Sequence, residues 1–218
     1  METTVDHDGA GSNGAAATSP IDIPGAEIVE ALSRALELHD YRRGLFAETE
    51  AHGVRVTRLA LRLTERVAPE LAADPALAFG FQLHDIGMIG VSDSILSKRS
   101  GLTRDEVDEV REHPLLGERI VAPVACLAGI ARQVIGAHHE RWNGSGYPRR
   151  LERQRIPLPA RIFAIADVYD VMTNDQPYRS ALAPEVALAE IEQGAGLLFD
   201  PELVPVFLAM IEAADAAI

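Results

Sequence analysis

The sequence predicts an all-α protein that folds as a single domain. Ala and Leu are abundant, aromatic residues make up only 5% of the chain, and there is no long alternating run of Val, Ile or Thr. This composition favours helices over strands. Apolar residues account for 47% of the 218 residues, enough to fill a substantial core. We expect a disordered tail over residues 1–22, which are biased towards Gly, Ala, Ser and Thr, and a folded domain over residues 23–218.

Spacing of apolar residues and helix start signals predict the helices in the first half of the domain. Apolar residues recur every three or four positions over residues 26–38 and again over residues 48–66, so we expect a helix in each range. The next helix should begin at Asp74-Pro75, because an aspartate is a good N-cap and proline fits the first helical position. We expect this helix to end near His84.

The second half of the domain carries further start signals. Thr103 and Glu106 have the spacing of a capping box, in which the threonine oxygen accepts a backbone N–H and the glutamate reaches back to the threonine N–H. We expect the helix that they open to end at His113-Pro114. Further helices are expected over residues 125–138 and 160–172, and two more should begin at Pro184 and at Asp200-Pro201.

Charge and composition exclude several classes of function. The net charge of -13 argues against binding to a DNA or RNA polymer, which needs a basic surface. Cys126 is the only cysteine, so we expect neither a disulfide framework nor a thiolate zinc cluster. The apolar stretch VAPVACLAGIA is far shorter than the ~20 residues needed to cross a bilayer, and the N-terminus lacks the features of a signal peptide. We therefore expect a cytoplasmic protein with no membrane partner.

Histidines and carboxylates gather near the ends and inner faces of the expected helices. The candidates are Glu48, His52, His84, Asp85, His113, His138, His139 and Asp167. Mixed imidazole and carboxylate donors without thiolates suit divalent iron, manganese or zinc. Because these donors are too many for one ion, the sequence predicts two or three divalent ions that share a carboxylate. Such ions would also let an acidic protein bind an anionic substrate.

Six motifs follow one another in the order LHDIGMIGVSDSILSK, EHPLLGERI, HHERWNGSGYP, IPLPARIFAIADVYDVMT, QPYRSA and FDPELV. With these motifs the chain resembles the HD-GYP family, a branch of the HD phosphohydrolases that hydrolyses cyclic di-GMP, over roughly residues 26–210. The resemblance implies an HD-type helical bundle. It also implies a metal-dependent phosphodiesterase that converts a cyclic dinucleotide, cyclic di-GMP first of all, to pGpG, GMP or both.

The resemblance assigns roles to individual residues. His84 and Asp85 match the catalytic HD pair, with Asp85 as the expected bridge between two metal ions. Glu48 matches a glutamate that is associated with a three-metal site. The remaining metal ligands of the family are matched by His52, His113, His138, His139 and Asp167.

The GYP motif and QPYR are expected to contact the substrate. Gly146, Tyr147 and Pro148 form the GYP signature, and the resemblance implies that Tyr147 lies against the nucleotide. Arg179 matches a basic residue that faces the substrate phosphates. The GYP loop is also expected to offer a contact for a signalling partner protein. Glu140 and Arg141 are interpreted as groups that orient the neighbouring histidines, and Asp170 as either such a group or a further ligand.

Two positions depart from the family pattern. Met88 stands where the family usually has lysine, and Gln176 where it usually has arginine. The loss of these cations leaves two alternatives to a cyclic di-GMP phosphodiesterase: an HD-type phosphohydrolase with another nucleotide substrate, or a catalytically weak module that binds a nucleotide or a partner. Three arginines after the GYP motif either form a solvated loop or replace the missing phosphate contacts; they are Arg149, Arg150 and Arg153.

Overall fold

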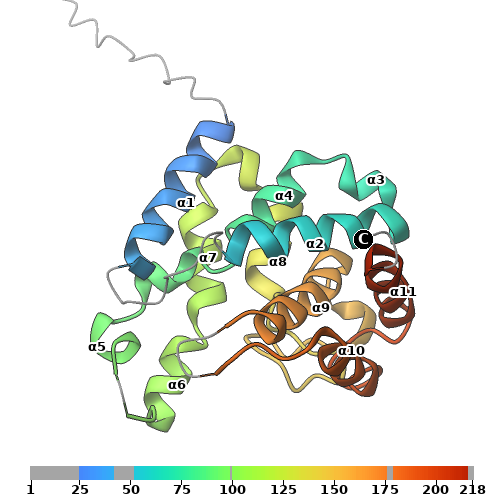
Figure 1. Ribbon diagram of the computed structural model, residues 1–218. Coiled ribbons are helices and arrows are strands. Elements are labelled where there is room, and N and C mark those ends of the chain that lie inside the picture. Colours follow the sequence, from blue (N-terminus) through green and yellow to red (C-terminus); the bar gives the residue numbers. More distant parts are fainter. Residues whose placement is uncertain (1–24, 42–51, 99, 176–178, 216–218) are drawn as a thin grey trace, which may run out of the picture.

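The structure, a computed structural model, describes residues 25–41, 52–98, 100–175 and 179–215. Over these residues the fold is all-α, as predicted, and the only β-type pairings are two isolated bridges. Figure 1 shows the helical bundle. The α-helices are α1 (Gly25–Tyr41), α2 (His52–Val67), α3 (Pro69–Ala72), α4 (Pro75–Gln82), α5 (Asp93–Leu96), α6 (Arg104–Val110), α7 (His113–Val121), α8 (Ile130–Ala137), α9 (Leu158–Thr173), α10 (Pro184–Gln193) and α11 (Leu203–Asp215), and the 3₁₀-helices are η1 (Ile86–Gly90), η2 (Ala125–Leu127) and η3 (Arg153–Arg155).

Two predicted helix starts are confirmed in atomic detail. The Asp74 carboxylate accepts a hydrogen bond of 2.9 Å from the backbone N–H of Ala76 and so caps α4. At α6 the capping box is complete: the Glu106 N–H donates to the Thr103 hydroxyl at 3.3 Å, and the Thr103 N–H donates to the Glu106 carboxylate at 2.7 Å. These side chains satisfy backbone donors that a helix start leaves unpaired.

Helix boundaries near two of the histidines differ from the prediction. The helix opened by Thr103 ends at Val110, and His113 begins α7 instead of ending α6. The reason is Pro114, which lacks a backbone N–H and therefore fits the first turn of a helix, so it marks a start here. The predicted helix over residues 125–138 is interrupted at Gly129, whose φ of 69° is left-handed, and α8 begins only after it.

The main core lies where α2 packs against α9 and α4. Three phenylalanines, Phe81, Phe163 and Phe207, are fully buried there together with aliphatic side chains of α2. Helix α8 contacts α4, α7 and α9, and Figure 1 shows α10 and α11 at the end of the bundle away from α1. Among the helices that the structure describes, none is long and apolar enough to span a bilayer.

The HDIG motif is held by a close contact between η1 and α7. A Cβ atom on Gly87 would lie 1.9 Å from the carbonyl oxygen of His113 and 2.6 Å from the backbone nitrogen of Gly117. Only a residue without a side chain permits this approach. The contact brings Asp85, which immediately precedes η1, next to His113 at the start of α7.

We expect Gly87→Ala to lower the free energy of unfolding by at least about 1–3 kcal/mol, because the added methyl group would force η1 and α7 apart. Urea unfolding followed by circular dichroism would measure the change. Gly101→Ala is the matched control, since a Cβ at Gly101 would meet nothing within 4 Å. Equal stability of the two variants would contradict this account of the HDIG glycine.

Candidate functional site

The structure brings the predicted ligands together from five helices, apart from Glu48, which lies outside the described residues. His52 begins α2, and Asp167 lies within α9. His84 and Asp85 follow α4, His113 begins α7, and His138 and His139 follow α8. Their side chains form two adjacent groups, each of which could hold a metal ion.

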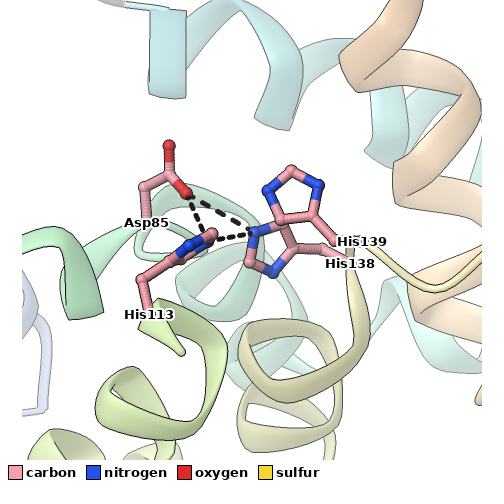
Figure 2. A group of neighbouring side chains, drawn as sticks. All are labelled: Asp85, His113, His138 and His139. Atoms are coloured by element: carbon pink, nitrogen blue, oxygen red, sulfur yellow. Dashed lines mark hydrogen bonds and ion pairs between the residues drawn. The ribbon is translucent and has the colours of Figure 1, made fainter. Parts of the chain in front are cut away.

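The first group consists of Asp85, His113, His138 and His139 (Figure 2). Oδ1 of Asp85 lies 3.2 Å from Nε2 of His113 and 3.4 Å from Nε2 of His138, and these two nitrogens are 3.1 Å apart. The imidazole of His139 stands beside them, with ring centroids 4.2 Å from His138. The Asp85 side chain is 38% exposed, whereas that of His138 is 0% exposed, so an ion or a substrate reaches the group from the Asp85 side.

The second group consists of His52, His84 and Asp167. Nε2 of His52 lies 3.2 Å from Oδ1 of Asp167. His84 connects the two groups, because its Nε2 lies 3.4 Å from the other carboxylate oxygen of Asp85. Asp85 therefore faces both groups, the position that a bridging carboxylate requires.

Three of the imidazoles are oriented in the same way. In each ring Nδ1 lies within hydrogen-bond distance of the carbonyl oxygen three residues earlier, and since a carbonyl only accepts, Nδ1 carries the hydrogen. Nε2 is then the ring atom that can bind a metal ion once it carries no hydrogen. The pairs are His84 with Phe81 at 2.9 Å, His113 with Val110 at 2.8 Å, and His138 with Ile135 at 2.9 Å.

The charges of the first group suit a cation. Burial would favour a neutral Asp85, but the imidazoles of His84, His113 and His138 hold the pKa of this carboxyl well below its usual range. Burial lowers the pKa of His138 and, more strongly, that of His139. Metal ions bind neutral imidazole and ionised carboxylate, so these protonation states are the ones that a metal site needs.

In the second group both nitrogens of His52 face carboxylates. Nδ1 lies 2.7 Å from Oδ2 of Asp170, and Nε2 faces Asp167. Burial would lower the pKa of His52, but hydrogen bonds from both aspartates outweigh it and raise this pKa to about 10. Burial likewise opposes ionisation of Asp167, but His52 brings its pKa down to about 2. A proton thus sits between His52 and Asp167, where a divalent ion would fit the same donors.

Arg55 is a supporting residue that the sequence analysis did not single out. Its Nε and Nη2 donate to the two oxygens of Asp170 at 3.0 and 3.1 Å, which fixes the carboxylate that faces His52. Of the two interpretations of Asp170, the structure favours the orienting one, because its carboxylate bonds to Nδ1 of His52 and to Arg55. The available signal was spacing, since Arg55 follows His52, and Asp170 follows Asp167, by one helical turn.

The GYP loop packs directly on the histidine pair. A Cβ on Gly146 would lie 2.5 Å from the carbonyl oxygen of His139 and 2.4 Å from the backbone nitrogen of Arg141, so this position requires glycine. The Tyr147 ring stacks on His139 with centroids 4.7 Å apart. Tyr147 thus lies beside the first group, and its contact with the nucleotide, which the resemblance implies, stays a prediction. Pro148 continues the loop.

Glu140 has a different role from the predicted one. Its carboxylate accepts the backbone N–H groups of Arg149 at 2.7 Å and Leu151 at 3.0 Å, so it holds the GYP loop and does not orient a histidine. The side chain of Arg149 pairs with Glu118 and donates to the carbonyl of Gly136 at 3.0 Å. Arg149 therefore serves the loop and does not replace a phosphate contact.

A cavity of about 510 Å³ opens beside both groups. Arg179 lies on it and donates from Nη2 to the carbonyl of Val171 at 2.9 Å. The lining residues are His139, Arg141, Asp167, Val168, Val171, Met172 and Arg179. Met88 lies in η1, partly buried, and Gln176 lies outside the described residues.

Several known proteins are similar to this chain in sequence or in fold. A family model described as "HD domain" matches residues 31–203. The "Cyclic di-GMP phosphodiesterase" of Thermotoga maritima is 36% identical over 183 residues, which are 84% of this chain and 48% of that protein. The "3'3'-cGAMP-specific phosphodiesterase 2" of Vibrio cholerae is 32% identical over 184 residues, which cover 84% of this chain and 33% of the relative. The chain thus spans about half the length of these curated relatives, or less.

A solved structure supports the fold. The protein described as "Bd1817, a HDG"Y"P protein from Bdellovibrio bacteriovorus" aligns with a TM-score of 0.61 and 15% identity over 86% of this chain and 63% of its own. At this identity the likeness concerns the fold alone. The match to the family model shows that the chain belongs to the HD-domain family.

Proposed function

We propose that this chain is a metal-dependent phosphodiesterase that hydrolyses a cyclic dinucleotide, with cyclic di-GMP as the first candidate and pGpG, GMP or both as products. The observation that carries the proposal is the pair of histidine and aspartate groups that meet at Asp85 and border one cavity with cationic side chains. Paired sites suit phosphodiester hydrolysis, because two ions can stabilise both the attacking and the leaving oxygen.

We assign the metal ligands to the two groups and to Glu48, which completes the predicted set. Two or three divalent ions are proposed, with iron or manganese as first candidates and zinc as a further one, because imidazole nitrogens and carboxylate oxygens suit all three. When bound, such ions supply Lewis acidity at the phosphoryl group and acidify a water molecule. The proposed ligands are Glu48, His52, His84, Asp85, His113, His138, His139 and Asp167.

In this proposal Asp85 orders the histidines, and two further side chains bind the substrate. Asp85 stays ionised, because three imidazoles lower its pKa, and holds His113 and His138 in place. Tyr147 presents its ring beside His139, where a nucleobase or ribose can pack against it. Arg179 contributes a positive charge on the cavity wall for the phosphates. A signalling partner at the GYP loop stays a prediction.

The relatives support a cyclic dinucleotide but leave two substrates to compare. The Thermotoga relative is named for cyclic di-GMP and the Vibrio relative for 3'3'-cGAMP. Met88 and Gln176 favour the second candidate function, a shift to another cyclic dinucleotide, since both replace cations of the family pattern. A module that only binds nucleotide fits the ligand set less well, because each described position that matches a metal ligand of the family carries a histidine or an aspartate.

Asp85→Ala should abolish hydrolysis while the helical content remains, because the bridging carboxylate is lost but the apolar core is untouched. Purified protein loaded with iron or manganese would be incubated with cyclic di-GMP and with 3'3'-cGAMP, and the products separated by chromatography. Asp105→Ala, on the exposed face of α6, is the control and should leave turnover unchanged. Full activity of Asp85→Ala would contradict the role assigned to Asp85. An inactive wild type would refute the proposed phosphodiesterase activity.

Asp170→Asn should weaken metal binding at the His52 group by roughly 10- to 100-fold. The neutral amide would replace the anionic carboxylate that accepts the hydrogen bond from Nδ1 of His52, so His52 would be held less firmly. Titration of the metal-free protein with Mn²⁺, followed by electron paramagnetic resonance, would measure this affinity. Asp105→Asn is the matched control. Unchanged Mn²⁺ affinity in Asp170→Asn would show that the pairing of Asp170 with His52 does not support the metal site.

Met88→Lys with Gln176→Arg should lower the KM for cyclic di-GMP by about tenfold or more, since each cation can add a charge-assisted hydrogen bond of ~1.5–3 kcal/mol. We expect kcat to change little, because such a contact is made equally in the ground and transition states. Steady-state kinetics on the wild type and the single and double variants would measure both constants. If the double variant gains nothing with cyclic di-GMP, while 3'3'-cGAMP is the better substrate of the wild type, the second candidate function is correct.

A further inference from the structure

Arg141 has a buried nitrogen that the structure leaves without a partner. Its Nη1 is shielded from solvent, and within the described part of the chain it has no hydrogen-bond acceptor. The backbone of Arg141 is held in place by the close approach of Gly146. Arginine N–H groups at this depth are normally paired, because an unpaired buried donor is costly. An acceptor from outside the chain is therefore expected at this position.

The surroundings of Arg141 indicate what kind of acceptor fits. Arg141 and Arg179 both line the cavity, so two arginines border one space in a chain of net charge -13. The planar guanidinium matches the oxygens of a phosphate through paired N–H donors. Cavities of about 510 Å³ accommodate ligands of nucleotide size.

The same cavity has room for a second phosphate away from the metal groups. His139 and Asp167, one from each group, mark the place of the reacting phosphate. From Asp167 the wall continues along α9 to Val171, whose carbonyl holds Arg179, and to Met172. Four to five residues of helix separate these positions from Asp167, a rise of roughly 6–7.5 Å. A substrate with one phosphate at the metal groups can thus present another phosphate to the two arginines.

We propose that Arg141, together with Arg179, binds the second, non-reacting phosphate of the cyclic dinucleotide and so determines the preference for substrates with two phosphates. The proposal rests on the proposed function. It assigns Arg141 a role in binding the substrate, whereas the sequence pattern indicated only a group that orients the histidines. Arg141 then contributes chiefly to substrate affinity and little to the chemical step.

The test compares a substrate that has two phosphates with one that has a single phosphate. Cyclic di-GMP and bis(4-nitrophenyl) phosphate would be assayed with the metal-loaded wild type, Arg141→Met, Arg141→Lys and Arg132→Met. Arg132 is the matched control, because it is exposed on α8. We expect Arg141→Met to raise the KM for cyclic di-GMP roughly 10- to 100-fold with kcat little changed. Hydrolysis of bis(4-nitrophenyl) phosphate should stay at the wild-type level, and Arg141→Lys should recover part of the affinity.

A binding measurement separates this proposal from the proposed activity. Calorimetry with a hydrolysis-resistant phosphorothioate analogue of cyclic di-GMP should show the same weakening in Arg141→Met and none in Arg132→Met, with metal content and Tm unchanged. Equal losses with both hydrolysable substrates, or no change in analogue binding, would overturn the role of Arg141. If the wild type hydrolyses neither substrate, the proposed function fails, and analogue binding alone decides the role of Arg141.

Discussion

The hydrogen bond from a histidine Nδ1 to a backbone carbonyl at a helix end is the interaction on which the site depends. The last carbonyls of a helix have no partner within it, and His84, His113 and His138 each use one near the ends of α4, α6 and α8. Each helix end thereby gains a donor, and each imidazole gains a fixed direction. The positions of the three Nε2 atoms are therefore determined by the backbone and not by flexible side chains.

Packing of α2 against α9 fixes the side chains of the second group, just as hydrogen bonds at helix ends fix the imidazoles of the first. Asp167 and Asp170 lie one turn apart on α9, and His52 at the start of α2 reaches both. Arg55 donates hydrogen bonds to the carboxylate of Asp170, while the carboxylate of Asp167 faces Nε2 of His52. Burial of several charges is tolerated there because each faces an opposite charge at short range. The apolar contacts between the two helices thus set the geometry of a polar centre.

Most of the fold and most of the site were predictable from the sequence, for identifiable reasons. Asp74, Thr103 and Glu106 act through local hydrogen bonds, so their patterns translate directly into structure. The gathering of the histidines and carboxylates was predictable because imidazoles and carboxylates in this number have few other uses, whereas their role as metal ligands stays a prediction. The start of α7 was misjudged because Pro114 is compatible with either side of a helix boundary. Helical spacing places Arg55 on the face of His52, but it does not reveal the partner Asp170, which is 115 residues away. The role of Glu140 depends on how the following loop folds back, which the sequence pattern does not show.

The carboxylate of Glu140 also limits how this part of the chain can vary. Its two oxygens close a loop to the backbone of Arg149 and Leu151, and Gly146 rests against the histidine pair inside that loop. The length of the intervening chain is therefore fixed from both sides, whereas the exposed side chains of Asn143 and Ser145 are free to differ. We therefore expect an insertion or deletion between Glu140 and Arg149 to disturb the GYP loop more than a substitution at one of its exposed positions does.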